Sequence, residues 1–272
     1  MTASVQRLRP GRYRALVVSM DLLNEEQDGV TIRLAQAGDI AELVELNQRC
    51  FPAMVEQEVV WTKGHLAAHQ KVFPDGQIVA ELEGRLVGGV ASLIVNFGDM
   101  PYRPHTYAGI TDGGYFYNHD PRGDTLYGAD VFVDPDYRGR RIGAALYEAR
   151  RSLCRKLNLR RILAGGRIHG YSQHAADMTP EEYIHAVETG EIRDLVLSFQ
   201  LREGFVVRGV LRNYISDPNS RNCATLIEWL NPDHVPTEDN ARKIRVACVQ
   251  YQVRKIESFD QFAEQVEYFV DT

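Results

Sequence analysis

The stretch V-F-V-D-P-D-Y-R-G-R-R-I-G-A-A-L, from Val131 to Leu146, decides the fold. Its apolar start is typical of a strand, and Pro135 cannot continue a strand ladder. Gly139 and Gly143 permit a tight turn, after which apolar residues recur at helical spacing. The first amide groups of a helix have no partner within it, and its dipole is positive there. The stretch therefore predicts a strand–turn–helix unit that binds an anion such as phosphate.

Basic residues gather on this unit, although the whole chain carries a net charge of −6. Between Arg138 and Arg161 the only acid is Glu148, and the basic residues are Arg138, Arg140, Arg141, Arg150, Arg151, Arg155, Lys156, Arg160 and Arg161. Such a segment indicates an anionic partner. A solvated helix face is the alternative for the arginines from Arg150 onward. The glycines match neither G-x-G-x-x-G nor the Walker pattern.

Outward from the unit, strand and helix patterns alternate. Strands are expected over Thr31–Ala35, Gln77–Leu82, Leu86–Val95, Leu126–Val133 and Arg161–Ala164. One helix is expected to begin at Asp39, with Glu42 as its capping-box partner, and a second at Thr62. A third should cover Arg141–Leu157. The polar, aromatic segment 96–124 is too long for a simple turn, so we expect it to be functional or a packed loop.

Composition sets outer limits on the kind of protein. The 272 residues are 44% hydrophobic and 25% charged, as in a soluble globular protein. No apolar run reaches the roughly 18 residues of a membrane span, and the acidic balance argues against nucleic-acid binding. The cysteines lie far apart, which favours free thiols in a reducing, cytoplasmic compartment over disulfides or a zinc site. They are Cys50, Cys154, Cys223 and Cys248.

Arg138 to Gly143, R-G-R-R-I-G, resembles motif A of the GNAT acetyltransferases, Arg/Gln-x-x-Gly-x-Gly/Ala. Arg141 stands where the pattern prefers glycine. The resemblance implies an α/β (α+β) GNAT fold, in which helices flank a mixed, mostly antiparallel central sheet. It also implies acetyl-CoA as cosubstrate and no metal. The residues implied to bind the pyrophosphate are Arg138, Gly139, Arg140, Arg141, Ile142, Gly143 and Ala144, and those implied to bind the pantetheine arm are Val131, Phe132 and Val133.

A second match lies at Ser198–Phe205, S-F-Q-L-R-E-G-F, which is similar to the family's Phe-Tyr-x-Lys-x-Gly-Phe. Gln200 takes the place of a tyrosine that protonates the leaving thiolate in many members. Glutamine cannot release a proton near neutral pH, so that role is vacant or filled elsewhere. Thr179-Pro180-Glu181-Glu182 predicts a helix inserted before the Phe199 helix. With segment 96–124 it should cover the acceptor side, or else serve as a structural lid.

Acyl transfer to an amine needs a base, because an amine of pKa ~10.4 is mostly protonated at pH 7. Asp130 and Tyr127, on the strand before motif A, are the candidate catalytic residues. The alternatives are an arginine-paired strand acid and a core tyrosine. His65 and His69 lack the glutamate of an HExxH site, so no metal is expected there. His105, His119, His169 and His174 are expected to be hydrogen-bonded loop residues.

Two longer segments resemble the GNAT module fused in front of a carbon–nitrogen hydrolase (nitrilase-like) domain. They contain H-T-Y-A-G-I-T-D-G-G and G-G-R-I-H-G-Y. The tail, K-I-R-V-A-C-V-Q-Y-Q followed by a helical pattern, is similar to the opening of such a hydrolase domain, which the chain would then contain only in part. We expect an arm or added strand over 1–30, the GNAT domain over 31–230, a linker over 231–242 and the hydrolase opening over 243–272.

The resemblance therefore implies an acyl-CoA-dependent N-acetyltransferase (EC 2.3.1 class). Its acceptor would be a small-molecule or peptide amine, and its partner its own hydrolase domain, with no nucleic acid and no membrane. Self-association is left open. The alternative is a degenerate module that binds acyl-CoA, or nothing, and regulates or docks the hydrolase. The intact turn at Arg138–Gly143 favours the first function, whereas Gln200 favours the second.

Overall fold

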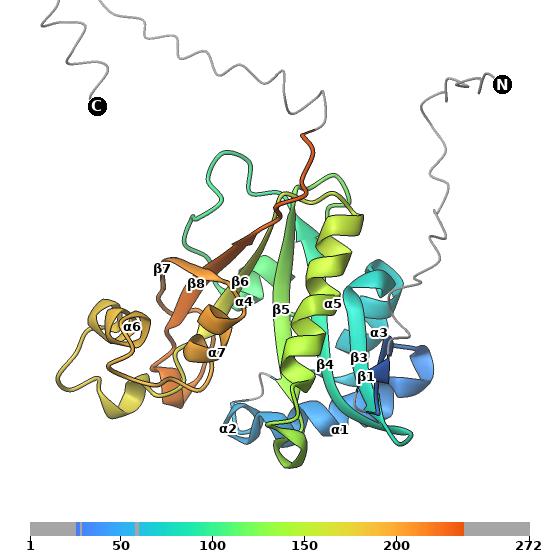
Figure 1. The fold of residues 1–272 in the computed structure, drawn as a ribbon, viewed down its shortest axis with the longest axis horizontal. Helices are drawn as coiled ribbons and strands as arrows, with labels where there is room; N and C mark the ends of the chain where they lie inside the picture. Colours follow the sequence, from blue (N-terminus) through green and yellow to red (C-terminus); the bar gives the residue numbers. More distant parts are fainter. Residues whose placement is uncertain (1–25, 28, 58–59, 237–272) are drawn as a thin grey trace, which may run out of the picture. The chain divides into compact units, whose positions relative to one another are not determined.

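The computed structural model describes residues 26–27, 29–57 and 60–236. They form an eight-stranded sheet in the order β1-β2-β3-β4-β5-β6-β8-β7 (Figure 1). The strands are β1 Glu26–Gln27, β2 Val30–Leu34, β3 Gln77–Leu82, β4 Arg85–Val95, β5 Thr125–Val133, β6 Arg161–Arg167, β7 Val206–Leu211 and β8 Ala224–Leu230. Only β5 and β6 pair in parallel. The expected mixed, mostly antiparallel sheet is thus confirmed within the described residues, and β1 adds the end of the predicted arm to it.

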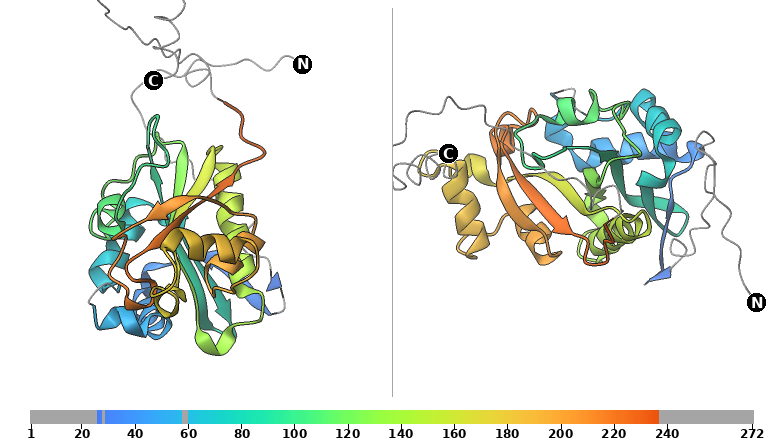
Figure 2. Two further views of the ribbon diagram at one scale, coloured as in Figure 1. Left: turned by 90° about the vertical axis from the view of Figure 1, so that its left-hand side faces the viewer. Right: turned by 90° about the horizontal axis from the view of Figure 1, so that it is seen from above.

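Helices cover both faces of the sheet. They are α1 Ile40–Cys50, α2 Pro52–Val55, α3 Lys63–Val72, α4 Tyr107–Thr111, α5 Ile142–Lys156, α6 Pro180–Glu188 and α7 Leu197–Arg202. The helix α5 lies on one face, and α1 and α3 lie on the other (Figure 2). Leu146 of α5 packs with Ile78 and Val90 on the first face, whereas Leu46 of α1 packs with Leu93 on the second. Burial of alternate strand side chains on both faces makes one core on each side of the sheet.

The helix starts show where local sequence was sufficient. The Thr62 hydroxyl accepts a hydrogen bond from the His65 N–H at 3.4 Å, which confirms the cap of α3. The capping box expected between Asp39 and Glu42 is wrong. A 3₁₀ turn precedes α1, so Asp39 instead accepts the Gln36 N–H at 2.7 Å. The Glu42 carboxylate accepts the Leu86 N–H at 2.8 Å.

The chain divides into two compact units after Val235. Residues at the start of the predicted linker are tied to the first unit, since the Asn231 side chain donates to Leu159 O at 2.8 Å and the Val235 N–H to Asn158 Oδ1 at 2.9 Å. The predicted strand and helix over 243–272 lie outside the described residues. Within the described ranges, no helix has the length and apolar content needed to cross a membrane.

Candidate functional site

The parallel strands β5 and β6 separate halfway along their length. Thr125–Gly128 pairs with Arg161–Ala164, but no pairing continues to the ends of the two strands. The register between β4 and β5 shifts at the same level, because Ala91 faces Asp130 while Ser92 faces Gly128. An extra residue in one strand bends it away from its neighbour. The bulge therefore leaves a wedge-shaped opening between Ala129–Val133 and 165–167.

Arg150 of α5 holds this bulge in place. Its Nε donates to Ser92 Oγ at 3.1 Å, and its NH2 group donates to the carbonyl oxygens of Ala91 and Asp130. A side chain at Gly128 would come within 2.7 Å of the guanidinium, so glycine is needed there. The suggestion that arginines from Arg150 onward lie on a solvated face is wrong for Arg150, which is 1% exposed. A buried arginine bonded to strand carbonyls fixes the shape of the opening.

The free edge of β5 offers backbone groups at alternate residues. The Asp134 N–H donates to Val87 O at 2.9 Å, so by alternation the backbone of Phe132 also faces β4. The backbone groups of Val131 and Val133 then face the opening. The Phe132 ring is buried 5.8 Å from the Trp61 ring. Two of the three residues implied for the pantetheine arm thus present backbone groups to the opening, and the third forms part of its wall.

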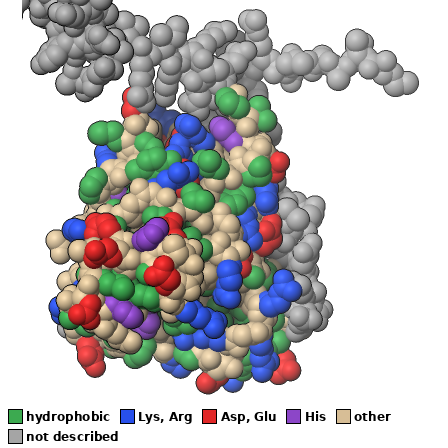
Figure 3. Space-filling view, turned by 60° about the vertical axis from the view of Figure 1, so that its left-hand side comes forward, with side chains coloured by type: hydrophobic (Ala, Val, Ile, Leu, Met, Phe, Trp, Pro, Cys, Tyr) green, Lys and Arg blue, Asp and Glu red, His purple; other side chains and the backbone are tan. Residues whose placement is uncertain are grey.

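The turn after β5 is exposed and rich in unpaired amides. Ala145 has the first N–H that bonds back along α5, to Arg141 O at 3.0 Å. The N–H groups of Ile142, Gly143 and Ala144 therefore lack intrahelical partners. Gly139 has φ +83° and open space where a side chain would be. In Figure 3 several Lys and Arg side chains gather at the lower right of the view, whereas acidic side chains gather at its left.

Two residues of this turn have features that anion binding alone does not explain. Arg141 has φ +61°, in the left-handed region. This explains why the family pattern has glycine there, since a side chain costs roughly 1–2 kcal/mol in that conformation. A side chain at Gly143 would lie 3.1 Å from Phe199 Cζ. Gly143 therefore lets α7 approach α5, besides offering its amide.

Gln200 is buried between α7, α5 and the end of β6. Its amide nitrogen donates to the Tyr147 hydroxyl at 3.3 Å. Its Oε1 has no hydrogen-bond partner in the described part of the chain, and a side chain at Gly166 would overlap it. The structure places Gln200 beside the opening with a neutral amide. The hydroxyl group it contacts belongs to Tyr147.

Asp130 lies at the free edge of β5. Its Oδ1 accepts the Val131 N–H at 2.8 Å, and its Oδ2 accepts Asn47 Nδ2 at 3.3 Å. Burial raises the pKa of Asp130 to about 6, and the charge of Arg167 opposes the rise. No ion pair with an arginine involves Asp130 among the described residues. A carboxylate that is ionised at neutral pH, with a raised pKa, is suited to accept a proton.

Tyr127 is the middle of a hydrogen-bonded chain that crosses the α1/α3 face. Its hydroxyl lies 2.9 Å from that of Tyr214 and 2.8 Å from His105 Nε2. His105 Nδ1 lies 2.9 Å from Arg103 O, which can only accept, so Nδ1 carries a proton. In the neutral ring Nε2 then accepts from Tyr127, which in turn accepts from Tyr214. Burial keeps the pKa of His105 below its usual value.

Three further histidines named from the sequence have hydrogen-bond partners, whereas the expected side-chain hydrogen bonds of His169 and His174 are not found among the described residues, where the His174 ring only lies 5.3 Å from that of Tyr183. His65 Nδ1 accepts the Thr62 N–H at 3.2 Å, and His119 Nδ1 accepts the Ile94 N–H at 3.0 Å. His69 Nε2 lies 2.6 Å from Gly114 O, and its ring stacks on Phe116. In the described part of the chain no three His, Cys, Asp or Glu side chains are placed to hold a metal ion.

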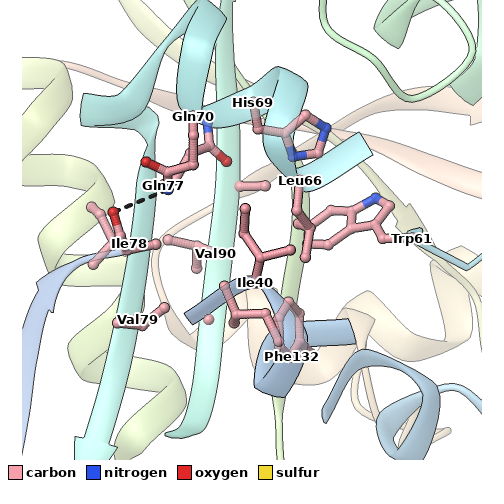
Figure 4. A pocket seen from close by; sticks show the side chains of 14 residues that line it. Ile40, Trp61, Leu66, His69, Gln70, Gln77, Ile78, Val79, Val90 and Phe132 are labelled. Atoms are coloured by element: carbon pink, nitrogen blue, oxygen red, sulfur yellow. Dashed lines mark hydrogen bonds between the residues drawn. The ribbon is translucent and has the colours of Figure 1, made fainter. Parts of the chain in front are cut away.

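A cavity lies beside the site, between α1, α3 and the sheet (Figure 4). Trp61, Leu66 and Phe132 are among its lining residues, and its volume is about 20 Å³. That is room for about one water molecule. His69 is one of the lining residues, and its Nδ1 has no hydrogen-bond partner among the described residues. The cavity is too small for a substrate.

The two unusual segments lie on different sides. Segment 96–124 brings His105 and Tyr107 to the apolar cluster that holds Tyr127. The inserted helix α6 is confirmed, with a capping box between Thr179 and Glu182. Its buried residues, however, join the cluster on the α5 face, and the helix packs against α7 (Figure 1). The apolar stripe of α6 thus packs on the α5 face and not beside segment 96–124, so the two segments do not cover one side together.

Sequence reasoning missed three residues of the site. Asn47 holds Asp130, Tyr214 starts the hydroxyl chain, and Arg167 lies on the free end of β6. Arg167 belongs to the quoted G-G-R-I-H-G-Y segment, which was a usable signal. Nothing local marks Asn47 or Tyr214, which reach the site from distant parts of the chain.

Residues 40–177 match the Acetyltransferase (GNAT) family. The chain is 43% identical over 258 residues to the probable hydrolase YhcX of Bacillus subtilis, which covers 93% of this chain and 49% of that protein. It is 40% identical over 205 residues to the uncharacterized N-acetyltransferase YkwB of Bacillus subtilis, which covers 75% of this chain and 90% of that protein. The chain thus spans about half the length of the first relative and most of the second.

Two solved structures share the fold. One is the GphF GNAT-like decarboxylase in complex with isobutyryl-CoA, with a TM-score of 0.62, 23% identity, and 74% of this chain and 98% of that chain covered. The other is the loading GNATL domain of CurA from Lyngbya majuscula, with a TM-score of 0.63, 20% identity, and the same coverage, 74% and 98%. At this identity the likeness concerns the fold alone.

Proposed function

The chain belongs to the GNAT family of acetyltransferases, and from that premise we propose that it transfers an acetyl group from acetyl-CoA to the nitrogen of an amine. The observation that carries the proposal is the opening between β5 and β6, with an exposed, amide-rich turn at one end and Asp130 at its edge. In the transfer the thioester C–S bond breaks and a C–N bond forms. The amine loses a proton and the thiolate gains one.

The residues present fit coenzyme A, which supplies the acyl thioester. The unpaired amides of 142–144 and the exposed arginines of the turn suit the pyrophosphate. The backbone groups of Val131 and Val133 suit the pantetheine amides. The Val133 carbonyl already accepts a hydrogen bond from Arg138 Nε at 3.3 Å. A ligand amide would replace Arg138 at this carbonyl or bind beside it.

Asp130 is proposed as the base that takes the amine's proton. Its carboxylate accepts the N–H of Val131, which faces the opening and could otherwise bind the acetyl oxygen as it becomes an oxyanion. If the Asp130 carboxylate turns to the amine, the Val131 N–H becomes free to bind the developing oxyanion. Deprotonation and oxyanion stabilisation are thus coupled through Asp130 and Val131. The hydroxyl chain from Tyr214 through Tyr127 to His105 runs toward segment 96–124 and offers a second path for a proton away from the opening.

Thiolate protonation is assigned to water or to a side chain other than Gln200. The leaving thiolate is only weakly basic, near the ~8.5 of a free thiol, so loss of a positioned acid need not stop the reaction. The alternative function, binding of acyl-CoA without turnover, is favoured by the same residue, because a buried neutral amide stands where many relatives have a proton donor.

Calorimetry with acetyl-CoA and a thiol-release assay over a panel of amines test the proposal. We expect saturable binding and amine-dependent release of free thiol. Binding without release for any amine would support the docking module instead. Absence of binding by the folded protein would refute acetyl transfer and acyl-CoA binding alike, and would favour a docking module that binds no acyl-CoA.

The hydrolase fusion is a further part of the proposal. The tail 243–272 resembles the opening of a carbon–nitrogen hydrolase domain, and the match to YhcX covers 93% of this chain but only 49% of that protein. We infer that residues 31–230 act beside such a domain. In a protein that carries both parts, a hydrolase rate that changes on acetyl-CoA binding would support this inference, and an unchanged rate would contradict it.

A further inference from the structure

Arg167 lies at the end of β6 that does not pair with β5. Its register with β8 is regular, so its side chain is on the same face as that of position 165. A side chain at Gly165 would overlap the Tyr214 ring, which places both on the face that carries Tyr127 and Asp130. The Arg167 guanidinium lies 5.0 Å from the centre of the Phe51 ring, at the end of α1.

Only part of this guanidinium is engaged by the protein. Its NH1 group donates to Asp217 Oδ2 at 3.1 Å. Asp217 is fully buried, whereas the Arg167 side chain is 17% exposed. Its Nε and NH2 groups have no protein hydrogen-bond partner in the described ranges. Arginine has five N–H donors in a planar fork that matches a carboxylate. Most of that donor capacity therefore remains for a ligand.

Asp130 faces Arg167 across the opening without touching it. No ion pair within 4.0 Å joins them among the described residues, although Arg167 is the charge that most strongly opposes the raised pKa of Asp130, which burial causes. Each side chain is bound by other groups. Arg167 contacts Asp217 and the Phe51 ring. Asp130 accepts hydrogen bonds from Asn47 and from the Val131 N–H. Two opposite charges are thus kept apart on the two sides of the opening.

We propose that the acceptor is a zwitterion, a primary amine that carries a carboxylate nearby, as in a free α-amino acid. This inference rests on the proposed acyl transfer. Arg167 binds the carboxylate through its free donors, and Asp130 receives the amine. An N-terminal peptide amine has an amide in place of that carboxylate, which offers Arg167 a neutral acceptor and no opposite charge. A simple alkylamine leaves the Nε and NH2 donors of Arg167 without a ligand partner, while NH1 stays bonded to Asp217. The two charges together therefore select amino acids over peptides and amines.

The test compares acceptors that differ only at the carboxylate. Thiol release is measured for a panel of free amino acids, the matching amino acid amides and the decarboxylated amines, with the full chain and saturating acetyl-CoA. We expect kcat/KM to favour the free acid by about ten- to a hundredfold, the range for hydrogen bonds to charged groups. In Arg167→Gln that preference should vanish, because kcat/KM for the free acid falls while kcat/KM for the amide changes little. Arg167→Lys should retain part of the preference.

Arg212→Gln is the matched control. Arg212 is 55% exposed and pairs with Glu181, outside the opening. The Arg212→Gln variant should therefore have the same kcat/KM as the wild-type protein for both the acid and the amide. If Arg167 served only to hold Asp217, Arg167→Gln would lower kcat/KM for acid and amide equally, which would overturn the inference. Equal or better use of the amide by the wild-type protein would overturn it too, while leaving acyl transfer intact. Binding of acetyl-CoA with no amine acetylated would refute the proposed function itself.

Discussion

The substitution Asp130→Asn should raise the stability of the folded protein at neutral pH and should strongly lower kcat/KM. Burial raises the pKa of Asp130 from its usual 3.8 to about 6. The folded protein therefore binds a proton more readily than the unfolded chain, and stability falls as pH rises from about 4 through 6. A difference of about two units corresponds to about 3 kcal/mol at pH 7.5. Folding with an ionised Asp130 costs that amount, and asparagine removes the cost.

The substitution also loses one contact. Asn47 donates to Asp130 Oδ2 at 3.3 Å, while Asn47 Oδ1 accepts the Trp61 N–H, so Asn47 cannot simply reverse its amide. A lost hydrogen bond costs about 1 kcal/mol, which leaves a net gain of about 2 kcal/mol at pH 7.5. For a chain of this size that raises Tm by about 4–8 °C. At about pH 4 the wild-type group is protonated when folded, so the gain should vanish.

Thermal unfolding of both proteins at the two pH values measures the effect, together with kcat/KM. Loss of a positioned base should lower the rate roughly 10²–10⁴-fold. Asp194→Asn is the control. Asp194 is buried and accepts the N–H groups of Gly170, Val196 and Leu197, so its variant should be less stable at both pH values. A Tm difference for Asp130→Asn that is negative at pH 7.5, or equal at both pH values, would refute the reasoning.

Three further outcomes are expected. Gly143→Phe should weaken acetyl-CoA binding at least tenfold by calorimetry, about 1.4 kcal/mol, because the new ring would displace Phe199 beside the helix N-terminus; unchanged affinity in a folded variant contradicts the assignment. A fragment that ends at residue 236 should unfold cooperatively and bind acetyl-CoA, since the first compact unit ends at Val235; collapse of the fragment would show that the tail completes the core. Gln200→Ala should lower kcat less than Asp130→Asn does. In the wild-type protein, kcat/KM should rise as pH passes about 6, where Asp130 ionises, and should show no further change near a tyrosine pKa of ~10. Turnover that is abolished by Gln200→Ala and not by Asp130→Asn would contradict the roles given to both residues.

Local patterns were enough for the hairpin β3–β4, the caps of α3 and α6 and the helix α5. Each depends on residues within a few positions of one another, and the structure confirms them. The motif at Arg138–Gly143 likewise identified the family, because a strand, a tight turn and a helix N-terminus are contiguous in the chain. Even there, the reason for the family's glycine at Arg141 became apparent only from the φ of +61° in the three-dimensional structure.

The tertiary structure alone decided the opening and its charges. The bulge at Ala129 arises from register between strands, and Arg150, whose spacing fits an exposed helix face, is buried to hold it. Asp130 acquires its raised pKa from burial, which no local pattern encodes. Arg167 faces it only because β6 separates from β5 after Ala164. Secondary structure follows from neighbours in sequence, whereas reactivity here depends on desolvation and on charges brought together from strands and helices far apart in the chain.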